Sequence, residues 1–169
     1  GEKEALKALE KACNTGIFSK DDADVVVEFL LYKSSVQDVG EVRKRSVLTH
    51  LIAFKRHHPA GFRDTTLRSL LQAVQSYKDG DHAAWTKKIT LTSIKMFYLW
   101  MIEEKYLNLD EKKIRQIKLP KPPAQSHRPD DLLTEDDIKQ IVSAAKNSRD
   151  RAFFMLLYES GCRIGELAA

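Results

Sequence analysis

Cysteine is scarce in this 169-residue sequence, which contains only Cys13 and Cys162. No Cys-x-x-Cys pair occurs, and no histidines and cysteines cluster at the spacing of metal ligands. A disulfide between two such distant cysteines stays possible, but the pattern favours two ordinary thiols in a cytoplasmic protein. We therefore expect neither a metal nor any other cofactor, which argues against a metal- or thiol-dependent enzyme.

Long apolar runs and sheet-forming runs are also missing. No stretch approaches the roughly 18 apolar residues that a membrane span needs, so we expect no membrane partner. The clearest β-branched run comprises Val25, Val26 and Val27, but the length of the segment and the N-cap residue Ser19 favour a helix there. The expected fold class is all-α.

Apolar residues recur at helical spacing along the first two thirds of the chain. Four helices are expected there. The first follows Ser19, and the second lies within residues 38–62 and ends before Pro59. The third runs from a cap at Asp64 to Asp79, and the fourth lies within residues 82–107. The buried stripe of the last of these is Leu91, Ile94, Tyr98 and Met101. The adjacent His57 and His58, at a helix end, are expected on the surface.

Proline is nearly absent outside one segment, since four of the five prolines lie within residues 120–129. They remove backbone donors and disfavour a helix, which predicts an extended, semi-rigid linker. Beyond it, Thr134 and Asp137 have the spacing of a capping box, and Ser148 is expected to cap the next helix. The apolar side chains expected to be buried on that helix are Phe153, Phe154, Leu156, Leu157 and Tyr158. Gly161 is expected to end it.

Charge of one sign is concentrated in the middle of the chain. The formal net charge is −4 over residues 1–42, +11 over residues 43–128 and −3 over residues 129–169. A basic centre between acidic ends is typical of a surface that faces phosphates. Lys88, Thr92 and Lys95 also lie on one helical face, which suits phosphate oxygens but equally describes an ordinary solvated face.

Two motifs carry a resemblance to a known family. The segment after the linker opens with "LLTEDDIKQIV", and the apolar helix that follows ends in "LLYESGCRIGEL". In this order the motifs resemble the tyrosine recombinases, which include phage-type integrases and Xer-type site-specific recombinases. The usual Thr-Gly-x-Arg-x-x-Glu-Leu is matched by residues 160–167, with Ser160 in place of threonine. The segment "TKKITLTSIKMFYLWMIEEKYL" also resembles a helix of the family's core-binding domain.

The resemblance implies a domain organisation and a chemistry. Residues 1–118 would form a four- to five-helix, SAM-like core-binding domain, residues 119–133 a linker, and residues 134–169 the truncated, helical start of the catalytic domain. In this family a tyrosine attacks a DNA phosphodiester to form a 3′-phosphotyrosine, and arginines stabilise the charge on the phosphate. Arg163 would be the first of these catalytic arginines, with Glu166 available to orient its guanidinium.

The other catalytic residues of the family have no match in this sequence. No His-x-x-Arg occurs, and every tyrosine precedes Arg163. We therefore expect a fragment of a DNA-breaking and rejoining enzyme that binds double-stranded DNA but is itself inactive.

The resemblance also suggests which residues contact DNA. It further implies that the complete protein self-associates on DNA. The phosphate contacts would be Arg43, Lys44, Arg45, Lys87, Lys88 and Lys95, with Lys121 and Arg128 following the backbone along the linker. Phosphate or base-edge contacts would come from Thr90, Thr92 and Ser93. The alternatives are a helical DNA-binding regulator without enzymatic activity, or a protein-interaction module whose basic centre meets an acidic partner.

Overall fold

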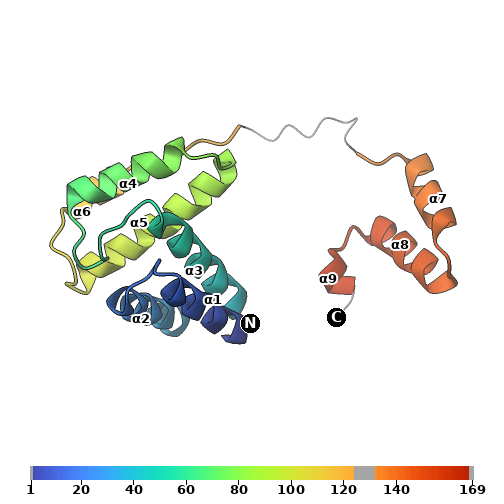
Figure 1. Ribbon diagram of the computed structural model, residues 1–169. Helices are drawn as coiled ribbons and strands as arrows, with labels where there is room; N and C mark the ends of the chain where they lie inside the picture. The colour runs from blue at the N-terminus through green and yellow to red at the C-terminus, as the bar shows by residue number, and fades with distance from the viewer. Residues whose placement is uncertain (1, 124–131, 168–169) are drawn as a thin grey trace. The chain divides into compact units, whose positions relative to one another are not determined.

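Figure 1 shows the computed structural model of the protein, which describes residues 2–123 and 132–167. Over these ranges every regular element is a helix and no strand occurs, so the all-α prediction is confirmed. In chain order the helices are α1 (Glu2–Asn14), α2 (Lys20–Gln37), α3 (Glu41–Lys55), α4 (Leu67–Asp79), α5 (Ala84–Glu103), α6 (Glu111–Gln116), α7 (Glu135–Ala144), α8 (Ser148–Ser160) and α9 (Ile164–Leu167). No helix in the described ranges is both long enough and apolar enough to cross a membrane.

The chain divides into two compact units, residues 1–123 and residues 124–169. The first unit contains α1 to α6, with α3 packed against both α1 and α5. The second contains α7, α8 and α9, with α7 packed against α8.

Reciprocal hydrogen bonds between an N-cap side chain and the third helical residue begin three of the helices. These capping boxes join Ser19 to Asp22, Thr66 to Ser69, and Thr134 to Asp137. The predictions of Ser19 and Thr134 as caps are therefore confirmed. Gly161 ends α8 in the left-handed conformation, with φ 61°, as the sequence predicts.

Two predicted caps are wrong. Helix α4 begins after Thr66 rather than at Asp64, which lies in a turn where its backbone N–H donates to the carbonyl oxygen of Gly61. The cap of α8 is Asn147, whose side-chain oxygen accepts a hydrogen bond from the N–H of Asp150 at 2.8 Å. Ser148 is the first residue of that helix.

Helix α6 was not expected from the sequence. It is one and a half turns long, too short for a periodic apolar face, but it buries Ile114 completely. Its last carbonyl groups are held by α5: the ammonium of Lys95 donates to the carbonyl oxygens of Arg115 at 2.8 Å and Ile117 at 3.1 Å.

The core of the first unit is a chain of aromatic rings contributed by α2, α5 and the segment between α3 and α4. Phe62, from that segment, is fully buried and lies edge-on to Phe97 of α5, with ring centroids 4.8 Å apart. Phe97 in turn contacts Phe29 of α2 at 5.2 Å. The predicted stripe on α5 is confirmed, since Leu91, Ile94, Tyr98 and Met101 are all buried.

A buried ion pair fixes the segment that carries Phe62. One oxygen of Asp22 accepts a hydrogen bond from the backbone N–H of Phe62 at 2.7 Å, and the other lies 2.9 Å from the ammonium of Lys55. The same ammonium donates to the carbonyl oxygen of Ala60 and lies over the Phe62 ring. Burial alone would raise the pKa of Asp22, but the amide of Phe62, the Lys55 ammonium and the amide of Ser19 together hold it below its ordinary value.

The prediction that His58 lies on the surface is wrong. Its side chain is 1% exposed, because the segment after α3 folds back over the core. Its Nε2 atom lies 3.3 Å from the hydroxyl of Ser69, and its ring stacks on Phe54. Burial, with the nearby charge of Lys55, lowers the pKa of His58, so the ring is neutral near pH 7.

The apolar residues of α8 are not buried, contrary to the sequence-based expectation. None of the residues of α7 or α8 is buried, and Phe154, Leu156 and Tyr158 each expose more than a third of their surface. The reason is geometric: α7 covers one side of α8, while the apolar residues of α8 are spread around its whole circumference.

Candidate nucleic-acid interface

Helices α3 and α5 carry most of the residues predicted to contact DNA, and they pack directly on one another. Where they meet, Nδ1 of His50 lies 2.9 Å from the hydroxyl of Ser93. Burial and, secondarily, the charge of Arg43 lower the pKa of His50, so this contact is made by a neutral ring near pH 7. The two helices are therefore connected by a polar contact between His50 and Ser93.

Two of the predicted contacts on α5 are wrong because their side chains lie inside the unit. Thr90 is 1% exposed, and its hydroxyl accepts a hydrogen bond from the Tyr77 hydroxyl at 3.0 Å. Ser93 is 5% exposed and is engaged with His50 and with the carbonyl oxygen of Ile89. Polar and apolar residues alternate along this part of α5. This pattern in the sequence does not reveal that the hydroxyls of Thr90 and Ser93 bond to side chains of other helices.

The three predicted cations at the start of α3 differ in how far they are neutralised. Lys44 pairs with Glu41 on the same helix, and Arg45 pairs with Glu4 of α1. Arg43 is exposed, and no carboxylate of the described residues lies within ion-pair distance of it. Arg43 is thus the predicted α3 cation that keeps its full positive charge toward solvent.

A lysine that sequence analysis did not single out lies close to Arg43. Lys33 of α2 is 6% exposed and bonds to the side-chain oxygen of Gln37. Burial, followed by the charge of Arg43, lowers the pKa of Lys33. The charge of Arg43 thus acts, after burial, on both Lys33 and His50, so the three side chains are neighbours. The separation of Lys33 and Arg43 by ten positions hid this proximity in the sequence.

On α5, Lys87 and Lys88 have no carboxylate partner among the described residues. The ammonium of Lys88 lies over the exposed ring of Trp85, 4.8 Å from its centroid, a position that keeps the charge accessible. Thr92 donates its hydroxyl hydrogen to the carbonyl oxygen of Lys88 at 2.8 Å. Lys95, from the same predicted row, is instead engaged with the end of α6, so its ammonium has a structural role.

Of the two predicted linker contacts, one belongs to the described part of the chain. Lys121 is exposed. Arg128 lies outside the described residues.

In the second unit, Arg163 follows the bend at Gly161 and is 90% exposed. Its guanidinium lies 3.6 Å from a carboxylate oxygen of Glu166, and its backbone N–H donates to the other oxygen at 3.0 Å. The Glu166 carboxylate therefore both accepts a hydrogen bond from the residue before α9 and faces the guanidinium. Because α9 has four residues, its dipole adds little to this position.

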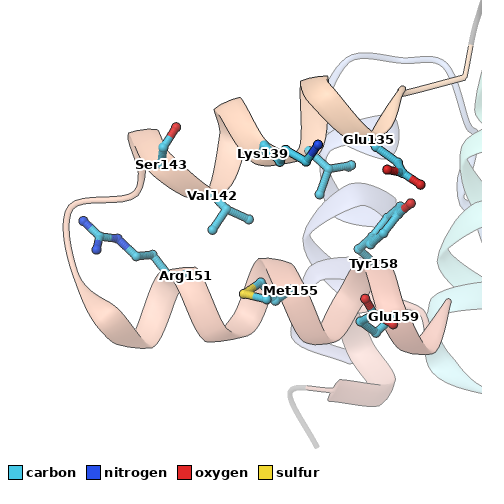
Figure 2. A pocket seen from close by; sticks show the side chains of 9 residues that line it. Glu135, Lys139, Val142, Ser143, Arg151, Met155, Tyr158 and Glu159 are labelled. Atoms are coloured by element: carbon cyan, nitrogen blue, oxygen red, sulfur yellow. The ribbon is translucent and has the colours of Figure 1, made fainter.

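A hollow of about 600 Å³ lies between α7 and α8 in the same unit. Figure 2 shows Val142 of α7 and Met155 of α8 lining it from opposite sides, with Tyr158 directed from α8 toward Glu135 on α7. The described residues contain no group of three or more histidines, cysteines, aspartates or glutamates arranged to hold a metal ion. The hollow is a helix–helix seam with charges of both signs at its rim, so it does not suit a polyanion.

Comparison with known proteins identifies relatives of one kind. The chain is 24% identical over 146 residues to "Tyrosine recombinase XerA" of Pyrococcus horikoshii, a match that covers 86% of this chain and 46% of that protein. It is 30% identical over 130 residues to "Tyrosine recombinase XerC" of Myxococcus xanthus, covering 73% of this chain and 42% of that protein. The chain thus spans less than half the length of these curated relatives. No protein-family model and no solved structure matches it.

Proposed function

The chain belongs to the tyrosine recombinase family, and we propose that it is the DNA-binding part of a site-specific recombinase or integrase. Residues 1–118 would act as the core-binding domain, residues 119–133 as the linker, and residues 134–169 as the beginning of the catalytic domain. The complete protein would cleave and rejoin DNA through a 3′-phosphotyrosine. Every tyrosine of the 169-residue sequence precedes Arg163, so this chain has no candidate for the nucleophile and would bind without cutting.

The observation that carries this proposal is the surface formed by α3 and α5. Arg43 lies near the start of α3, Lys87 and Lys88 lie near the start of α5, and none of the three has a carboxylate partner among the described residues. Unpaired cations on two packed helices match what a duplex requires, since phosphate contacts position a protein on DNA and dominate its affinity. We rank these three residues first, and name this set the α3–α5 cations.

The remaining predicted residues have secondary roles in the proposal. Lys44 and Arg45 would exchange their present carboxylate partners for phosphates, while Thr92, Lys121 and Arg128 would extend the contact. Lys95 would act through the position of α6. In the second unit, Arg163 would bind the reacting phosphate in the complete protein, with Glu166 orienting it.

The proposal is tested by measuring the affinity for a fluorescent DNA duplex at several salt concentrations. If about six phosphates are neutralised, log K should fall with log salt with a slope near −5, because each contact contributes about −0.9. No covalent protein–DNA adduct should form on a suicide substrate. A chain that fails to bind duplex even at low salt, or that is trapped as an adduct, would contradict the proposal.

Releasing Arg45 from Glu4 should strengthen DNA binding. The pair is exposed on both sides and is worth about 0.2–1 kcal/mol, so Glu4→Gln should raise the affinity by a factor of roughly 1.4 to 5. The matched control is Glu10→Gln, which removes the same charge from the same helix at a residue without an ion pair in the described structure. Equal gains for both variants would show that only net charge matters and that Arg45 does not reach DNA.

The alternatives are less well supported. A DNA-binding regulator or a protein-interaction module would have no reason to match recombinases over most of this chain. Self-association on DNA and a cytoplasmic location belong to the same proposal as the recombinase function.

A further inference from the structure

Three lysines from three segments of the first unit converge on one hollow. Lys78 lies near the end of α4, Lys87 lies in the first turn of α5, and Lys118 follows α6. Together with His82 they line a hollow of about 430 Å³. The other lining residues are Ala84, Leu119 and Pro120. Lys78 had no role in the sequence analysis, because nothing in the sequence places it beside Lys118.

No negative charge offsets this set, which we call the lysine hollow. None of its lysines has an ion-pair partner among the described residues, and no carboxylate lines it. Asp79 and Asp81 are exposed on the turn between α4 and α5, outside the lining. Neighbouring ammonium groups repel one another more strongly at a protein surface than in bulk water, so an anion in their midst would relieve that repulsion.

Contacts between helices hold together the elements that line the hollow. The ring of Tyr77, which is 1% exposed, stacks on His82 with centroids 5.1 Å apart. The Tyr77 hydroxyl donates to Thr90 of α5, so the end of α4 and the start of α5 are held together. The ammonium of Lys95 holds the end of α6 on α5, just before Lys118. The ends of α4 and α6, which carry Lys78 and precede Lys118, are therefore both held against α5.

We propose that the lysine hollow binds one phosphate of the DNA backbone and fixes the position of the duplex at the start of α5. The inference rests on the proposed function and deepens it. A backbone phosphate fits better than a free one because further cations without an ion pair among the described residues lie near the lining lysines in the sequence. Lys88 follows Lys87 on α5, and Lys121 follows Lys118 toward the linker.

The test compares Lys78→Ala and Lys118→Ala with Lys20→Ala, an exposed lysine on α2 outside both proposed contact sets. Each hollow variant should flatten the slope of log K against log salt by about one unit, and Lys20→Ala should leave it unchanged. If the hollow variants keep the wild-type slope while Arg43→Ala flattens it, the hollow is not a phosphate site although the α3–α5 surface binds DNA. If the wild type does not bind duplex at all, the proposed function itself fails.

A second measurement separates the two sources of phosphate and guards against misfolding. In ¹⁵N-labelled protein, the amide signals of Gly80, His82 and Ala84 should shift on titration with a short duplex at phosphate concentrations well below those needed with inorganic phosphate. Equal concentrations for both would indicate a site for free phosphate and overturn the backbone assignment. Lys78→Ala should melt no lower than the wild type, since it removes a repelling charge, and Lys78→Arg should restore the salt slope.

Discussion

Replacing Asp22 by alanine is expected to lower the free energy of unfolding of the first unit by about 3–5 kcal/mol. The side chains of Asp22 and Lys55 are 2% and 4% exposed, so the substitution leaves a buried ammonium without its counter-ion. It also removes the acceptor for the amide of Phe62, whose ring is at the centre of the aromatic core. Urea unfolding followed by tryptophan fluorescence would measure the loss.

The neighbouring Asp21 provides a matched control. It pairs with Arg63 at 3.0 Å, but both side chains are substantially exposed, so Asp21→Ala should cost less than about 1 kcal/mol. Similar losses for the two variants would show that the Asp22–Lys55 pair is not the element that stabilises this segment.

The contribution of Asp22 should also depend on pH in a defined direction. Its pKa is lower in the folded unit than in the unfolded chain. The stabilisation is therefore complete above the ordinary aspartate pKa of about 4 and is lost as the pH falls below it. The Asp22→Ala variant should lack this acid-dependent loss, so the stability curves of the two proteins should converge as the pH falls through the lowered pKa of Asp22.

Removing all three α3–α5 cations is expected to abolish most of the DNA affinity. In the variant with Arg43, Lys87 and Lys88 changed to alanine, the salt slope should flatten by about 2.7. At 0.1 M salt this corresponds to a loss of affinity on the order of 10²–10³-fold, and the two lines should converge toward 1 M salt. Fluorescence anisotropy with a labelled duplex would measure both quantities.

The variant also distinguishes a contact surface from a general effect of charge. A triple variant at Lys7, Lys11 and Lys20, all exposed on α1 or α2, changes the net charge by the same amount. It should lose far less affinity and keep the wild-type slope. If the two triple variants behave alike, the duplex responds to the overall charge of the protein and not to the surface of α3 and α5. Circular dichroism should show the same helix content in both.

Local signals in the sequence were sufficient for most of the fold. Apolar periodicity located α2 to α5, and side-chain chemistry located the caps at Ser19 and Thr134. The two wrong caps share a physical cause, since more than one residue near the start of each helix has a side chain able to cap it. Thr66 and Asn147 each lie within two residues of the predicted cap, and only the final backbone geometry selects between them. Helix α6 escaped because its single buried residue, Ile114, sets no period.

The candidate site was less accessible to sequence reasoning. Charge counting found the basic centre, yet it could not tell free cations from engaged ones. Lys95 looks like Lys88 in the sequence, but a carbonyl pair some twenty residues away takes up its ammonium. Thr90 and Ser93 look like surface hydroxyls until α4 and α3 supply them with partners in Tyr77 and His50. Such pairings depend on contacts between helices, which spacing along one helix does not contain.

The hydrogen bond from the Phe62 amide to Asp22 gives an irregular segment the protection usually found in a helix. This amide should exchange with solvent deuterium only when the whole unit opens, whereas amides at the exposed turn near Asp81 should exchange quickly. A protease would therefore have little access between α3 and α4, despite the absence of regular structure there. Insertions should be tolerated at the α4–α5 turn far better than around Phe62.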